Sequence, residues 1–86
     1  MAETVDRIVG YVSDPEVSEK LHNLRHQGVV EYVVIEQKDT LRRRLRIQSD
    51  CGTECLVAIP RNQTLSDGAV LLLEEDRAIV VRLTEE

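Results

Sequence analysis

The alternation of apolar and polar residues predicts a mostly β chain of about six strands with one short helix. β-Branched and aliphatic residues recur at strand spacing in six segments, with turn residues between them. These segments are residues 5–12, 29–35, the two strands of a hairpin across 41–60, and 69–73 and 78–83. Gly10 interrupts the first strand and marks a bulge or a close approach of another backbone.

A helix is predicted near residues 15–27. Asp14 is placed to cap it, Pro15 suits the first helical position, and Gly28 is placed to end it. A narrow apolar stripe at i, i+4 and i+7 can lie against a sheet, and it consists of Val17, Leu21 and Leu24.

The central hairpin of residues 41–60 turns at Asp50, Cys51 and Gly52. A three-residue loop with Gly52 in the left-handed region fixes the register of the two strands. That register predicts a core-facing row of Leu45, Ile47, Cys55, Val57 and Ile59. The opposite face carries Arg44, Arg46 and Gln48.

The last hairpin has nearly continuous apolar runs on both sides of Glu75 and Asp76. Such runs indicate strands that are covered on both faces, or a surface for a partner or for a second copy in a homodimer. Leu65 stands between two turn segments and is expected to fold back into the core.

Composition limits the class of protein. The 86 residues suffice for a single domain, and the near absence of aromatic residues (2 %) leaves Val, Leu and Ile to fill the core. A formal net charge of −5 argues against nucleic acid as a partner. No apolar run reaches the roughly 18 residues that span a membrane, and the N-terminus lacks the features of a secretory signal, so a cytoplasmic protein without a membrane partner is expected.

Two histidines and two cysteines offer a possible metal site. His22 and His26 are one helical turn apart, and Cys51 and Cys55 are four residues apart across a turn, so the four could bind nickel or zinc. The predicted register places Cys55 in the core, and both histidines lie opposite the apolar stripe of the helix. The other interpretation is therefore a buried Cys55, an exposed Cys51, two solvated histidines and no cofactor.

A basic cluster precedes and enters the first strand of the central hairpin. It consists of Lys38, Arg42, Arg43, Arg44 and Arg46. It is either a solvated strand face that blunts a sheet edge or a docking surface for an acidic segment of a partner protein, since guanidinium groups fork to carboxylates.

Catalysis has little support in the sequence, which has no glycine-rich phosphate loop and no nucleophile with a base that can be placed beside it. A Cys51 thiol activated by neighbouring arginines is the remaining candidate. We therefore expect a protein that is not an enzyme.

The order of several short motifs resembles the N-terminal domain of the UreE-type urease accessory proteins, which are nickel metallochaperones. The matching segments are 44–47 (RLRI), 50–54 (DCGTE), 59–61 (IPR), 65–68 (LSDG) and the closing hairpin 70–81. The resemblance covers residues 29–83 well and 5–12 loosely, and it is not carried over to 14–28. The family usually has Asp-Gly where this chain has Asp76 and Arg77.

The resemblance implies two small sheets packed on each other, as in the substrate-binding domains of Hsp40 chaperones. It also implies a protein-interaction module that assists the assembly or metallation of a metalloenzyme such as urease, by binding a subunit or maturation factor of that enzyme. The C-terminal domain that binds nickel in the family has no counterpart in these residues, so no nickel ligand is transferred. The expected partner-binding residues are Arg42, Arg43, Arg44 and Arg46.

Overall fold

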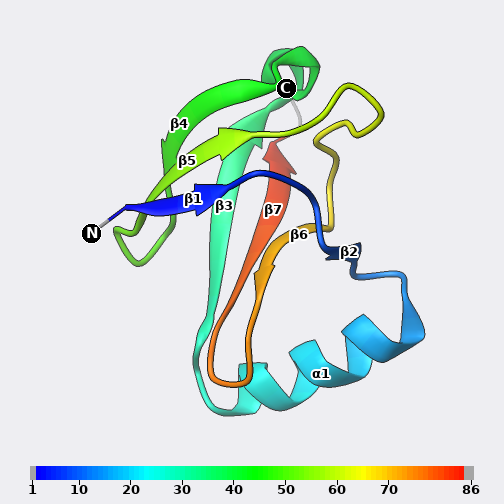
Figure 1. The fold of residues 1–86 in the computed structure, drawn as a ribbon. Coiled ribbons are helices and arrows are strands. Elements are labelled where there is room, and N and C mark those ends of the chain that lie inside the picture. Colours follow the sequence, from blue (N-terminus) through cyan, green and yellow to red (C-terminus); the bar gives the residue numbers. More distant parts are fainter. Residues whose placement is uncertain (1, 85–86) are drawn as a thin grey trace.

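The computed structural model describes residues 2–84 and contains seven strands, one α-helix and one short 3₁₀ helix (Figure 1). In chain order the elements are β1 (Glu3–Val5), β2 (Gly10–Tyr11), α1 (Pro15–His26), β3 (Val30–Glu36), η1 (Gln37–Leu41), β4 (Arg44–Gln48), β5 (Glu54–Ala58), β6 (Ala69–Leu73) and β7 (Ala78–Thr84). The predicted class, mostly β with two small sheets and one helix, is confirmed.

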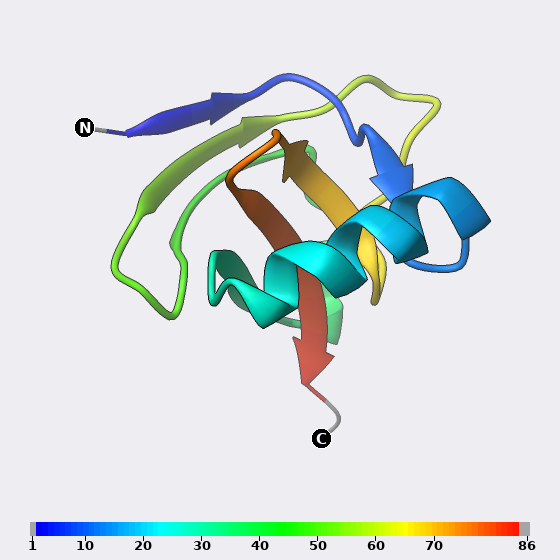
Figure 2. The ribbon, with the colours of Figure 1, turned by 90° about the horizontal axis from the view of Figure 1, so that it is seen from below.

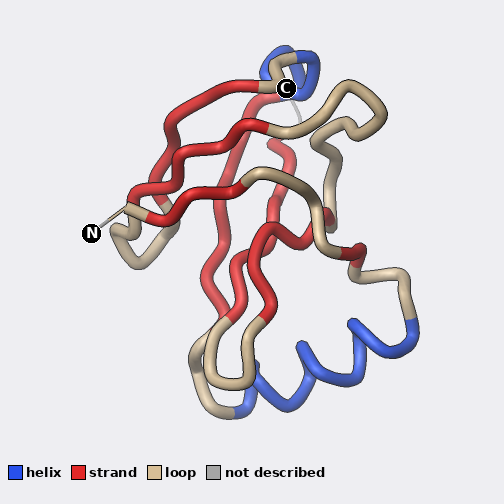
Figure 3. The backbone as a smooth tube through the Cα atoms, viewed as in Figure 1, coloured by secondary structure: helices blue, strands red, loops and turns tan. Residues whose placement is uncertain are grey.

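The strands form two sheets, as the backbone trace in Figure 3 shows. The three-stranded sheet has the order β1-β5-β4, with β1 parallel to β5. The four-stranded sheet has the order β2-β6-β7-β3, with β3 parallel to β7. All other neighbouring strands run antiparallel.

The prediction of a single strand over residues 5–12 is wrong, because the chain crosses there from one sheet to the other. β1 ends at Val5 in the first sheet, and β2 begins at Gly10 in the second. The side chain of Gln63 satisfies the backbone of the crossover: its Oε1 accepts from Ile8 N at 2.8 Å, and its Nε2 donates to Ile8 O at 3.1 Å. The close approach at Gly10 is made by a side chain rather than by another backbone, since a Cβ there would lie 2.9 Å from the Val17 side chain.

The molecule has three layers, with the four-stranded sheet between the three-stranded sheet and α1 (Figure 2). One hydrophobic cluster fills the space between the two sheets, and Leu65 lies fully buried within it as predicted. A second cluster joins the helix to the other face of the four-stranded sheet, and it consists of Leu21, Leu24, Val70, Ala78 and Val80. The predicted apolar stripe of the helix is thus its packing face.

The two ends of α1 follow the prediction only in part. Gly28 adopts a φ of +71° just after the helix, as expected for a glycine that ends it. Asp14 is the N-terminal flanking residue, but its side chain makes no capping hydrogen bond. Its Oδ2 accepts instead from the backbone N of Tyr11 at 3.2 Å, so the carboxylate satisfies a backbone donor of strand β2 rather than one of the helix.

The central hairpin has the predicted register. Leu45 pairs with Val57 and Ile47 with Cys55, and Gly52 adopts a φ of +86° in the loop. Ser49 N donates to Thr53 O at 2.8 Å, which closes a three-residue turn.

The closing hairpin of β6 and β7 is covered on both faces by the rest of the domain. Ile79 and Val81 face the three-stranded sheet, whereas Ala78 and Val80 face the helix, and all four are at most 2 % exposed. The nearly continuous apolar runs are explained by this double burial. The alternative of a partner or homodimer surface on this hairpin is therefore wrong.

Candidate partner-binding surface

Strand β4 offers an open edge of backbone hydrogen-bonding groups. Ile59 N donates to Arg43 O at 2.9 Å and Ser49 N to Thr53 O at 2.8 Å. The backbone N–H and C=O groups of the odd-numbered residues from 43 to 49 therefore point toward β5. Because antiparallel pairing alternates along a strand, the N–H and C=O groups of Arg44, Arg46 and Gln48 point away from β5. Within residues 2–84, no other strand lies beyond β4 in its sheet (Figure 1).

The two edges of the four-stranded sheet are, by contrast, capped by aspartates. On β2, Asp14 accepts from Tyr11 N through its carboxylate, and its own N donates to Tyr11 O at 2.9 Å. On β3, Asp50 Oδ1 accepts from Tyr32 N at 3.0 Å, and Asp50 N donates to Tyr32 O at 2.8 Å. Each aspartate thus takes up the outward N–H and C=O groups of one tyrosine on its edge strand.

The arginines of β4 lie on the outer face of the three-stranded sheet. Arg44 and Arg46 are exposed, as predicted, while Leu45 between them is buried. Arg46 Nε contacts Glu54 Oε1 on β5 at 2.8 Å, and this hydrogen bond, with the charge of Glu54, raises the pKa of Arg46. Within residues 2–84, Arg44 has no such carboxylate partner.

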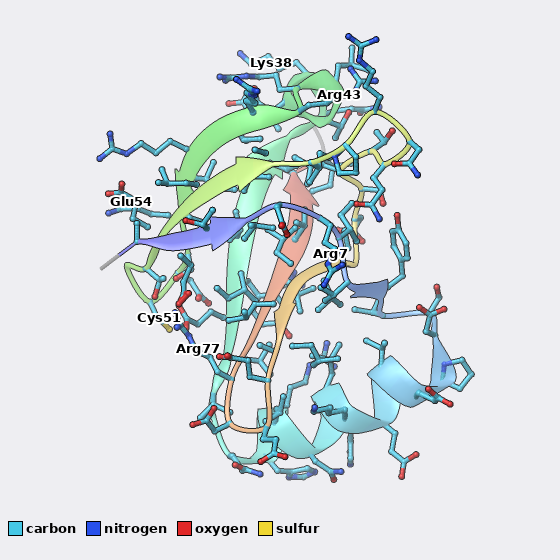
Figure 4. The ribbon with its side chains drawn as sticks, viewed as in Figure 1. Arg7, Lys38, Arg43, Cys51, Glu54 and Arg77 are labelled. Carbon is cyan, nitrogen blue, oxygen red and sulfur yellow. The ribbon has the colours of Figure 1, made fainter. Side chains whose placement is uncertain are left out.

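Arg42 and Arg43 lie on the bend between η1 and β4 rather than on the strand face. Arg42 is 3.7 Å from the carboxylate of Asp39, and Arg43 projects from the η1 end of the molecule, close to Lys38 (Figure 4). A hydrogen bond to Glu36 raises the pKa of Lys38. Leu41 lies next to the arginines with 80 % of its surface exposed, which the strand pattern did not predict.

The four proposed metal ligands do not form one site. Among residues 2–84, no group of three or more His, Cys, Asp or Glu side chains is arranged to hold a metal ion. His22 and His26 are neighbours on the exposed face of α1, whereas Cys51 lies in the hairpin turn. Cys55 is fully buried between the sheets, where its Sγ donates to Thr53 O at 3.7 Å. The Cys2His2 hypothesis is therefore wrong.

Cys51 is not an activated nucleophile either. Desolvation and the neighbouring Asp50 raise the pKa of its exposed thiol, which disfavours the reactive thiolate. The candidate of a thiol activated by arginines is therefore not favoured, because the lowering effect of Arg77 on this pKa does not outweigh desolvation and the charge of Asp50. Burial raises the pKa of Cys55 as well.

A charged network joins the two sheets through Arg77, and no sequence pattern predicts it. This arginine lies in the β6–β7 turn and is labelled in Figure 4. Its guanidinium donates to Glu31 Oε2 at 2.8 Å, to Glu3 Oε1 at 3.0 Å and to Thr53 Oγ1 at 3.1 Å. One side chain therefore connects β3, β1 and the start of β5.

Glu31 is the buried member of this network. Its second oxygen, Oε1, accepts from Ser49 Oγ at 2.6 Å, and the same Ser49 Oγ accepts from the backbone N of Cys51 and of Thr53. Burial alone would raise the pKa of Glu31, but hydrogen bonds from Ser49, Thr53 and Arg77 outweigh it, so the pKa is lowered.

These features define a small three-layer β domain with an arginine-lined sheet edge on β4. Within residues 2–84, no helix has the length and apolarity needed to cross a membrane. The family is defined by comparison with known proteins. Residues 16–84 match the model of the N-terminal domain of the UreE urease accessory protein, and the chain belongs to this family.

Individual relatives agree with the family match. The chain is 44 % identical over 82 residues to urease accessory protein UreE 1 of Pseudomonas syringae pv. syringae (strain B728a), which is 95 % of this chain and 56 % of that protein. It is 38 % identical over 78 residues to urease accessory protein UreE of Natronomonas pharaonis, which is 90 % of this chain and 36 % of that protein. The chain thus spans about half the length, or less, of these relatives.

The family match extends further than the motifs predicted. It begins at residue 16 and so includes α1, which the resemblance had left out. Leu21 and Leu24 explain why a helix belongs here, since they cover the face of the four-stranded sheet that would otherwise be exposed.

Proposed function

We propose that the chain is a non-catalytic interaction module that assists the assembly or metallation of a metalloenzyme such as urease, in the cytoplasm, by binding a partner protein. The open edge of β4 beside Arg44 is the observation that carries the proposal. The family membership and the printed names of the relatives, which are urease accessory proteins, support the choice of client.

The partner supplies an extended acidic segment that adds to β4 as a further strand. The outward backbone groups of residues 44, 46 and 48 form its main-chain hydrogen bonds. Arg44, which has no carboxylate partner within residues 2–84, pairs with a carboxylate of the segment, and Arg43 reaches a second one. Leu41 adds an apolar contact at the end of the strand.

Charge reversal tests the electrostatic part of this proposal. The double variant Arg43→Glu, Arg44→Glu should bind purified urease apoprotein or its accessory proteins at least tenfold more weakly, and the remaining binding should depend less on salt. A matched control, Arg7→Glu with Arg25→Glu, carries the same charge change at exposed positions on the β1–β2 crossover and on α1. Equal loss in both variants, or no loss in either, would refute a specific role for the β4 arginines.

A proline tests strand addition separately from charge. The N–H of Gln48 points outward, so Gln48→Pro removes one donor of the open edge and keeps the β4–β5 pairing and the net charge. The variant should fold, as far-UV circular dichroism would show, and should bind the partner several-fold more weakly. Full affinity in a folded Gln48→Pro protein would rule out strand addition.

A further inference from the structure

His22 and His26 form a close pair on the exposed face of α1, away from the residues that contact the sheet. Their Nε2 atoms are 3.2 Å apart, and their rings meet edge to face with centroids 4.6 Å apart. At this separation, one imidazole Nε2 donates a proton and the other accepts it. Two ring nitrogens thus already lie close enough to share one ligand.

We propose that this pair is a two-histidine site for a divalent first-row transition-metal ion. Imidazole nitrogens bind such ions at about 2.0–2.1 Å, so two nitrogens 3.2 Å apart would subtend an angle of about 100° at the metal. That angle lies between the right angle of octahedral and square-planar sites and the tetrahedral angle. The ion replaces the proton that the two rings share.

The helix holds the pair in place. Residues at i and i+4 lie on the same side of a helix, and Leu21 and Leu24 anchor the opposite side in the core with 2 % exposure each. Both histidines lie in the C-terminal half of α1, where the helix dipole favours a cation. Arg25 is the nearest cation in sequence, but it lines a separate hollow with Tyr32 and Asp67.

Two protein ligands leave the remaining coordination positions to water or to groups of another molecule. An open site of this kind suits an ion that is exchanged rather than one that holds a fold together. The site needs neither cysteine and is separate from β4, so it stands independently of the proposed function.

Nickel titration of the untagged full chain tests the site, in a Cys51→Ser background that removes the exposed thiol as a competing ligand. Ni²⁺ is the probe because imidazole binds it well and it does not oxidise thiols as Cu²⁺ does. Isothermal titration calorimetry should show one Ni²⁺ per chain, and the imidazole nitrogen resonances of both histidines should respond in NMR. His22→Ala and His26→Ala should each weaken binding at least about tenfold.

The matched control is Asn23→Ala, an exposed change on the same helix that should leave Ni²⁺ binding unaltered. Affinity that persists in both histidine variants would overturn the proposal, because another group then holds the metal. Absence of saturable binding up to about 1 mM Ni²⁺ would overturn it equally. All variants are first checked for native circular dichroism, since alanine favours the helix and should not unfold it.

Discussion

Replacing Arg77 by alanine should destabilise the domain by about 2 kcal/mol. The change leaves the Glu31 carboxylate, whose side chain is only 11 % exposed, with no cationic partner and with Ser49 and Thr53 as its remaining donors. Losing one member of a fully buried ion pair costs about 3–5 kcal/mol, whereas an exposed pair contributes at most about 1 kcal/mol. The side chains of Arg77 and Glu3 are 29 % and 32 % exposed, which places this network between the two limits.

Urea unfolding followed by far-UV circular dichroism measures the loss, since the chain has no tryptophan to serve as a fluorescence probe. In a domain of this size, about 2 kcal/mol corresponds to a fall in melting temperature of roughly 10 °C. The control is Arg61→Ala, an exposed arginine whose loss should change stability by less than about 0.5 kcal/mol.

A second variant separates the Glu31–Arg77 interaction from the other effects of removing Arg77. Glu31→Gln removes the charge that Arg77 neutralises, so the double variant should be less destabilised than the sum of the two single variants by at least about 1 kcal/mol. Additive effects, or an Arg77→Ala protein as stable as the native one, would show that the network contributes nothing to stability.

Three further predictions follow from the same structure. The lowered pKa of Glu31 means that the folded protein binds this proton less tightly than the unfolded chain, with its ordinary pKa of 4.5. Its stabilisation is therefore present above that value and lost as pH falls through the folded pKa, so Glu31→Gln should flatten the fall in unfolding free energy below about pH 5, measured by urea unfolding. Gly68→Ala should cost at least about 1 kcal/mol more than Gly28→Ala in the same assay: both glycines have positive φ, but only at Gly68 would the new methyl group lie 2.7 Å from a valine side chain. Ellman's reagent should titrate Cys51 alone in the native protein and Cys55 only after denaturation; two reactive thiols in the native state would contradict the burial of Cys55.

Local patterns predicted much of the fold. The Asp-Cys-Gly turn sets the register of the central hairpin, because a left-handed Gly52 and strict alternation leave one arrangement that turns Ile47 and Cys55 toward the core together. The apolar runs of β6 and β7 indicated either cover on both faces or a partner surface, and the helix supplies one of the two covering layers.

Interactions between distant residues account for what the sequence did not predict. The chain can leave one sheet after Val5 because Gln63, 55 residues beyond Ile8, satisfies the backbone of the crossover. Arg77 is a charged residue in a turn, and nothing in its neighbours indicates that Glu31, 46 residues earlier, lies within hydrogen-bonding distance.

The candidate site was predictable to the same limited extent. Alternation places Arg44 and Arg46 on the solvent face of the hairpin, and the structure confirms it. The position of β4 at a sheet edge follows from the order of the strands, which alternation does not predict. The contacts of Asp14 and Asp50 with the other edge strands are likewise invisible in the alternation.

The open edge of β4 also selects against pairing between copies of the chain. Two copies aligned antiparallel through β4 would bring one row of Arg44 and Arg46 beside an identical row, with like charges opposed across the new pair. The aspartates at Tyr11 and Tyr32 take up the outward backbone groups of one residue on each of β2 and β3. Under the proposed function, the charge that attracts an acidic strand to β4 is therefore the same charge that repels a second copy of the domain.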